Sequence, residues 1–149
     1  MKANRVLPPV YFLISIVAMA LLNFFGPVIE FVRYPWNLLG LVPLGIGIAL
    51  NLIADAAFKK EQTTVKPFEI STALITTGVF EISRNPMYLG MVLILIGIAI
   101  LMGSLSPLIV IVLFAALMEL VFVRTEEKML EQHFGLAWTE YQSKVRKWI

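Results

Sequence analysis

The ten residues EISRNPMYLG, at positions 81–90, place an arginine, an asparagine and a proline directly before a long apolar run. Asn85 is a preferred residue for the N-terminal cap of a helix, and Pro86 is favoured at the first helical position. The next amides then have no partner within the helix and can bind an anion, with the positive charge of Arg84 beside them. A plain helix cap with an arginine that reaches lipid phosphates explains the same residues. This stretch alone leaves both interpretations open.

Acidic residues form a second candidate group where the last apolar run meets the polar tail. Glu119 lies five residues before Arg124, and an ionisable side chain inside a membrane helix is a functional candidate by default. Glu126 shares a helix face with Glu119, because seven residues separate them. Glu127 is three residues from Arg124 and can pair with it on the surface. Glu126 is therefore the better candidate for an inward-facing role, with a polar helix end held by local ion pairs as the alternative.

These groups must be positioned by membrane helices, because the chain is too apolar for a soluble domain. Of its 149 residues, 59% are hydrophobic and 15% are charged, and the mean hydropathy is +0.85. Four apolar runs approach or reach the length that spans a bilayer, and the third is at the short end; they cover residues 6–25, 36–57, 86–102 and 105–123. The intervening GSLSP predicts a tight turn, so runs three and four are expected to form a hairpin. The predicted fold class is an all-α integral membrane protein with four transmembrane helices.

The C-terminal tail, EEKMLEQHFGLAWTEYQSKVRKWI, carries apolar residues at three- and four-residue spacing, with a break at Gly135. This pattern predicts that the fourth helix continues to about Phe134 and is followed by a cytoplasmic amphipathic helix. Such a helix can lie on the membrane surface or fold back as a lid, and the sequence leaves both open. His133 is expected to be structural.

Positive charge is distributed unevenly between the two ends of the predicted spans. Four spans place both termini on one side, together with the segment between the second and third helices, and the opposite side carries only Arg33. By the positive-inside rule, the polar segments are cytoplasmic. We therefore expect a multi-pass protein of a prokaryotic inner membrane with both termini in the cytoplasm; the cations on that side are Lys2, Arg5, Lys59, Lys60, Lys66, Arg84, Arg124, Lys128, Lys144, Arg146 and Lys147.

Composition also argues against several classes of site. The chain has no cysteine and one histidine, so thiolate chemistry is excluded and no metal site is expected. No basic run is long enough to indicate nucleic-acid binding. No internal repeat or linker divides the 149 residues, and we expect a single domain.

Together, TTGVFEISRNPMYLG (76–90) and EEKMLEQHFGLAWTEYQSKV (126–145) resemble the membrane methyltransferases that include isoprenylcysteine carboxyl methyltransferases and phospholipid N-methyltransferases. The resemblance covers about the last 85 residues. It rests on the combination of RNPMY, a helical hairpin, the paired glutamates and a Phe-Gly followed by tyrosine. Many members have histidine where this chain has Asn85. Because asparagine can hydrogen-bond but cannot carry a proton, we assign Asn85 no acid–base role.

The resemblance implies that S-adenosylmethionine is the methyl donor and that residues from about 65 to 149 form the catalytic part. It implies Arg124 and Glu126 as catalytic residues. The acceptor would be a lipophilic small molecule, a lipid or a prenylated substrate that enters from the bilayer. The implied cofactor-binding residues are Thr72, Ala73, Leu74, Ile75, Phe80, Asn85, Pro86, Met87, Tyr88 and Glu126.

Three other functions remain as alternatives. Within the same family, a phospholipid N-methyltransferase is the alternative to carboxyl methylation. A small transporter would use Glu119 or Asp55 as its coupling carboxylate, although the acidic residues cluster toward the cytoplasmic ends. A non-catalytic membrane subunit would use the tail as a docking helix.

Overall fold

The computed structural model describes residues 7–69 and 71–149, and its regular elements in these ranges are helices. Three positions used above, Lys2, Arg5 and Val6, lie outside the described residues. The helices, in chain order, are α1 (Pro8–Phe25), the 3₁₀ turn η1 (Trp36–Gly40), α2 (Leu41–Lys60), the 3₁₀ turn η2 (Gly78–Glu81), α3 (Pro86–Met102), α4 (Leu108–Leu117), the π-helical segment η3 (Met118–Val123), α5 (Arg124–Phe134) and α6 (Leu136–Lys144).

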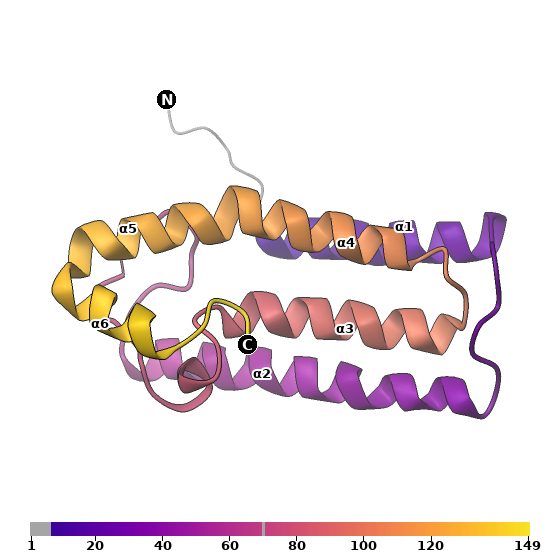
Figure 1. The fold of residues 1–149 in the computed structure, drawn as a ribbon, viewed down its shortest axis with the longest axis horizontal. Coiled ribbons are helices and arrows are strands. Elements are labelled where there is room, and N and C mark those ends of the chain that lie inside the picture. Colours follow the sequence, from indigo (N-terminus) through magenta and orange to yellow (C-terminus); the bar gives the residue numbers. More distant parts are fainter. Residues whose placement is uncertain (1–6, 70) are drawn as a thin grey trace.

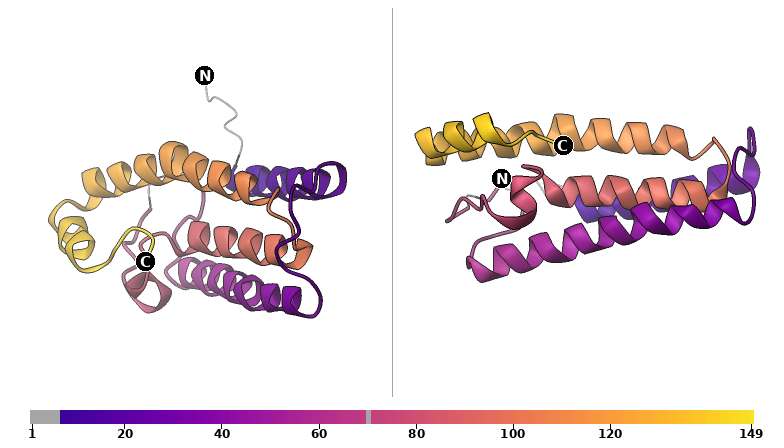
Figure 2. Two further views of the ribbon diagram at one scale, coloured as in Figure 1. Left: turned by 45° about the vertical axis from the view of Figure 1, so that its right-hand side comes forward. Right: turned by 60° about the horizontal axis from the view of Figure 1, so that its bottom comes forward.

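The apolar helices form a bundle in which α3 lies between α2 and α4, with α1 beside α4 (Figure 1). The segments α4, η3 and α5 make one helix, Leu108–Phe134, and its α5 part extends beyond the bundle (Figure 2). Helix α6 then turns back toward the loop that joins α2 to α3. We call this end, formed by residues 61–69 and 71–85, α5 and α6, the polar end of the bundle.

Three helices are long and apolar enough to cross a membrane, namely 8–25, 36–60 and 108–134. Helix α3 is apolar but has only 17 residues. Three of the four predicted spans therefore have the length and composition to cross a membrane. The short length of α3 fits its position, because it is flanked by protein and buries Leu89, Leu95 and Ala99. The outer helices carry the exposed apolar side chains expected of a lipid-facing surface, including Leu13, Ile14, Val17, Leu52, Ile53, Val112 and Leu113.

Glycines allow α2 and α3 to approach each other closely. A Cβ atom added at Gly47 would lie 2.5 Å from the carbonyl oxygen of Gly90, and one added at Gly40 would lie 2.5 Å from that of Gly97. Small residues at such a contact let helix backbones pack directly against each other in a membrane. The α2–α3 pair is therefore held at a fixed separation that a larger side chain would change.

Replacement of Gly47 by leucine is expected to lower the midpoint of thermal unfolding in detergent, because the new side chain meets the α3 backbone. Overpacking of this kind costs about 1–3 kcal/mol. Gly45 provides the matched control, since a Cβ atom there would meet nothing within 4 Å. Equal midpoints for Gly47→Leu and Gly45→Leu would contradict the close α2–α3 contact.

The predicted hairpin between α3 and α4 is present, and hydrogen bonds close this end of the bundle. Gly103 ends α3 with a φ of 74°, a left-handed conformation that favours glycine. The Ser104 hydroxyl donates to the side-chain oxygen of Asn23 at 2.6 Å, and the Ser106 hydroxyl donates to the carbonyl of Gly26 at 2.6 Å.

The tail follows the predicted break. Helix α5 ends at Phe134, and Gly135 adopts a φ of 52° before α6 begins. Helix α6 packs against the segment that precedes α3. Helix α6 buries Trp138 and Tyr141 against Val79 and Phe80.

Candidate functional site

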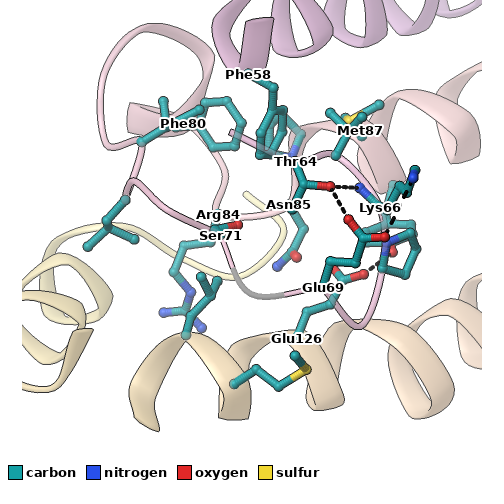
Figure 3. A pocket seen from close by; sticks show the side chains of 18 of the residues that line it. Phe58, Thr64, Lys66, Glu69, Ser71, Phe80, Arg84, Asn85, Met87 and Glu126 are labelled. Atoms are coloured by element: carbon teal, nitrogen blue, oxygen red, sulfur yellow. Dashed lines mark hydrogen bonds and ion pairs between the residues drawn. The ribbon is translucent and has the colours of Figure 1, made fainter. Parts of the chain in front are cut away.

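A cavity of about 310 Å³ lies at the polar end of the bundle. This volume is within the range of small-molecule sites. Its walls come from the start of α3, one face of α5, the loop that follows α2, and parts of α1 and α6. Figure 3 shows Glu126 on one side of the cavity and Phe58 and Phe80 on the other. Segments distant in sequence therefore converge on one space.

The start of α3 forms one wall through Asn85, Pro86, Met87 and Tyr88. Asn85 occupies the cap position as predicted, but its side chain does not cap the helix. Instead, its amide donates to the carbonyl of Lys147 at 3.2 Å and to Glu127 at 3.5 Å. Among the described residues, the backbone amides of Met87 and Tyr88 have no hydrogen-bond acceptor.

Glu126 lines the cavity from α5, and its carboxylate accepts a hydrogen bond from the Tyr88 hydroxyl at 2.7 Å. The two side chains come from different helices, so this contact joins α5 to the start of α3. Successive helical residues project about 100° apart, and Glu127 accordingly points away from the cavity toward other partners.

Those partners decide two points that the sequence left open. Arg84 does not reach for lipid phosphates: its Nε and Nη2 atoms each donate to Glu127 Oε1 at 2.9 Å. The side chains are only 7% and 11% exposed, and the guanidinium lies 5.7 Å from the ring of Trp138. Glu127 therefore does not pair with Arg124, because a buried cation 43 residues earlier in the chain takes its place.

Two residues assigned from the family resemblance do not line the cavity. The Arg124 side chain is 63% exposed and pairs with Glu119 at 3.3 Å on the outside of the helix. Thr72 is exposed, and its amide donates to the hydroxyl of Thr63 at 2.9 Å. The residues that follow it, Ala73, Leu74 and Ile75, do line the cavity.

Aromatic side chains form the wall opposite Glu126. The rings of Phe58 and Phe80 meet edge to face with centroids 5.5 Å apart. The Tyr141 hydroxyl donates to the Phe80 carbonyl at 2.6 Å. Burial raises the pKa of Tyr141 to about 12, so this hydroxyl stays protonated and keeps Phe80 in place at neutral pH.

Several lining residues were not assigned to the site from the sequence. His133, expected to be structural, lines the cavity from α5. The loop after α2 contributes Thr64, Lys66 and Glu69, which are joined by a 2.8 Å hydrogen bond from the Thr64 hydroxyl and a 3.5 Å ion pair (Figure 3). Loop residues lack the periodicity that marks a helix face, and only the folded chain shows which of them converge.

The two acids named for a transporter lie away from the cavity. Asp55 pairs with Lys59 at 2.6 Å on the surface, and Glu119 is bound by Lys147 at 2.9 Å. Neither acid lines the cavity. Within residues 7–69 and 71–149, no three histidine, aspartate or glutamate side chains are grouped so that they could hold a metal ion.

Comparison with known proteins identifies a family and a similar fold. A family model described as phospholipid methyltransferase matches residues 36–137. The fold is similar to that of a eukaryotic intramembrane Ras methyltransferase, isoprenylcysteine carboxyl methyltransferase, with a TM-score of 0.70 and 22% sequence identity. The match covers 95% of this chain and 51% of the other, so this chain spans about half the length of that protein. The comparison with curated proteins gave no match.

Proposed function

Because the chain belongs to the phospholipid methyltransferase family, we propose that this multi-pass membrane protein transfers a methyl group from S-adenosylmethionine to a lipophilic acceptor. One observation carries the proposal. A single cavity combines free helix amides, a carboxylate and aromatic rings. These are the groups that the carboxylate, the ammonium and the adenine of the donor require.

Each wall of the cavity has a proposed binding role. The amides of Met87 and Tyr88 receive the donor carboxylate at the positive end of α3. Glu126 attracts the ammonium and the ribose hydroxyls, and the Tyr88 hydroxyl holds its carboxylate in position. Phe80 and Phe58 pack against the adenosine. Residues from about 65 onward supply most of these groups, as the family resemblance implies.

Methyl transfer from this donor requires mainly that the protein align the acceptor atom with the methyl group. Bound S-adenosylmethionine supplies a methyl group already activated by a sulfonium, so the chain needs no covalent nucleophile. The loop after α2 and the buried Trp138 of α6 line the cavity, and together they would limit the access of water to a bound donor and acceptor.

The acceptor side of the cavity is apolar. Leu7, Pro8 and Pro9 at the start of α1 line the cavity together with Met91 of α3 and Met129 of α5. This lining supports a lipid or prenylated acceptor that reaches the cavity from the bilayer. We also propose that the polar end faces the cytoplasm of an inner membrane, because nearly all described cations lie there, namely Lys59, Lys60, Lys66, Arg84, Arg124, Lys128, Lys144, Arg146 and Lys147.

Two acceptor atoms fit a lipophilic substrate: a carboxylate oxygen, as in an isoprenylcysteine-like acceptor, and the amine of a phospholipid headgroup. Arg84 lines the cavity, but its charge is paired with Glu127 and is not available to a second carboxylate. His133 also lines the cavity, and its imidazole can accept the proton that an amine must lose. This observation favours phospholipid N-methylation as the second candidate.

Titration calorimetry tests donor binding, and we expect purified protein to bind S-adenosylmethionine and its demethylated product in competition with each other. Membranes incubated with methyl-labelled donor are expected to yield a labelled lipid that mass spectrometry can identify. A carboxyl methyl ester is cleaved by mild base and an N-methyl group is not, which separates the two acceptor classes. No binding heat with either ligand and no labelled lipid would contradict the proposal and favour a non-catalytic subunit.

A further inference from the structure

The last residues of the chain cross back over the bundle after α6 ends at Lys144. Val145 is extended, with φ −120° and ψ 132°, and the C-terminus lies near the start of α3 (Figure 1). We call residues 145–149 the C-terminal strap. It lies outside the region that the family model matches, residues 36–137.

The strap binds the three residues that precede α3 through its main chain. The backbone amide of Arg84 donates to the Arg146 carbonyl at 3.1 Å. The Ser83 hydroxyl and the Asn85 side-chain amide both donate to the Lys147 carbonyl at 3.2 Å. Two further hydrogen bonds run from Arg84 Nη1 to the carbonyls of Val145 and Gln142, at 3.0 and 3.1 Å. The strap thus holds the segment from which the cavity wall begins.

A carboxylate in the π-helical segment anchors the strap from the other side. Lys147 Nζ lies 2.9 Å from Glu119 Oε1 and 3.3 Å from Glu127 Oε2. The indole nitrogen of Trp148 donates to Glu119 Oε2 at 3.2 Å. The hydrogen bond with Glu119 raises the pKa of Lys147 above its usual value, so this cation stays charged at neutral pH. Glu119, an acid in an otherwise apolar helical segment, is therefore paired with the strap residues Lys147 and Trp148.

We infer that the C-terminal strap is a positioning element that orients the start of α3 for donor binding, with Glu119 as its anchor. The Asn85 side chain is occupied by the strap and by Glu127 and does not cap α3. The direction of the free amides of Met87 and Tyr88 therefore depends on the strap. The donor-binding part of this inference rests on the proposed function.

The test compares Lys147→Ala with Lys144→Ala in the full-length protein. Lys144 pairs with Glu140 on the exposed face of α6, where both side chains are at least 67% exposed, and it makes no contact with the strap anchor. Hydrogen exchange without donor is expected to be faster in Lys147→Ala only, at the hydrogen-bonded backbone amides of Arg84, Asn85 and Leu89. We expect the KM for the donor to rise about tenfold, as for the loss of a charged hydrogen bond, with kcat and the KM for the acceptor unchanged.

A conservative series separates positioning from general stability. Lys147→Arg keeps the charge and is expected to restore the donor KM. Trp148→Phe removes the indole hydrogen bond to Glu119 but keeps an aromatic ring against the core, and it should show a smaller effect in the same direction. If Lys147→Ala unfolds, Trp148→Phe provides the measurement.

Two results would overturn the inference: unchanged exchange at the amides of Arg84, Asn85 and Leu89, or faster exchange with an unchanged donor KM. A wild-type protein that binds no donor would instead defeat the proposed function. In that case, the exchange comparison still decides whether the strap holds the start of α3.

Discussion

Replacement of Glu127 by alanine is expected to destabilise the protein by about 3–5 kcal/mol, because it leaves the charge of Arg84 buried without its counter-ion. The Arg84 side chain is 7% exposed and contacts Glu127 through two nitrogen atoms. Water cannot readily take the place of the lost carboxylate. The free energy of unfolding in detergent, measured by denaturant titration, checks this expectation.

Two further variants make the result specific. Glu140→Ala removes an exposed partner of Lys144 and is expected to leave the free energy of unfolding close to that of the wild type, because an exposed ion pair contributes little to stability. The double replacement Arg84→Met with Glu127→Leu removes both charges and should recover much of the lost stability. If Glu127→Ala were no more harmful than Glu140→Ala, the ion pair would not be buried as described.

Replacement of Glu126 by glutamine is expected to weaken donor binding by about 10- to 100-fold, corresponding to the loss of a charged hydrogen bond in the cavity. Glutamine has nearly the same shape and can still accept a hydrogen bond from Tyr88, so folding should be preserved. Titration calorimetry with S-adenosylmethionine measures the effect.

Glu131→Gln is the matched control for this charge change, because Glu131 is exposed on the same helix and does not line the cavity. Its donor affinity should equal that of the wild type. An unchanged affinity in Glu126→Gln would show that Glu126 does not bind the donor. That result would leave open the proposed role of the α3 amides.

The local features of the fold could be predicted from the sequence. Pro86 marks the first residue of α3, Gly103 the end of that helix and Gly135 the break between α5 and α6. Each of these follows from a residue type acting on its own backbone: proline fits the first turn of a helix, and glycine tolerates a positive φ. The separation of Glu126 from Glu127 onto different faces follows equally from helical geometry.

The long-range contacts could not be predicted in the same way. Sequence spacing placed Glu127 beside Arg124, three residues away, yet its partner is Arg84, 43 residues distant. A pairing within one helix can be read from periodicity, whereas a pairing between helices depends on how the bundle packs. The contribution of loop residues 64–69 and 71–75 to the cavity and the course of the strap depend on packing for the same reason.

The π-helical segment determines how α5, which carries Glu126, is rotated about the helix axis relative to α4. A π-helical turn contains about one residue more than an α-helical turn, so it rotates everything that follows by roughly 100° relative to an uninterrupted α-helix. Residues Met118–Val123 lie directly before α5. With a regular turn there, the lipid-facing side of α4 could keep its orientation while Glu126 turned away from Tyr88. The π-helical turn therefore allows one continuous helix to face lipid in its α4 part and the cavity in its α5 part.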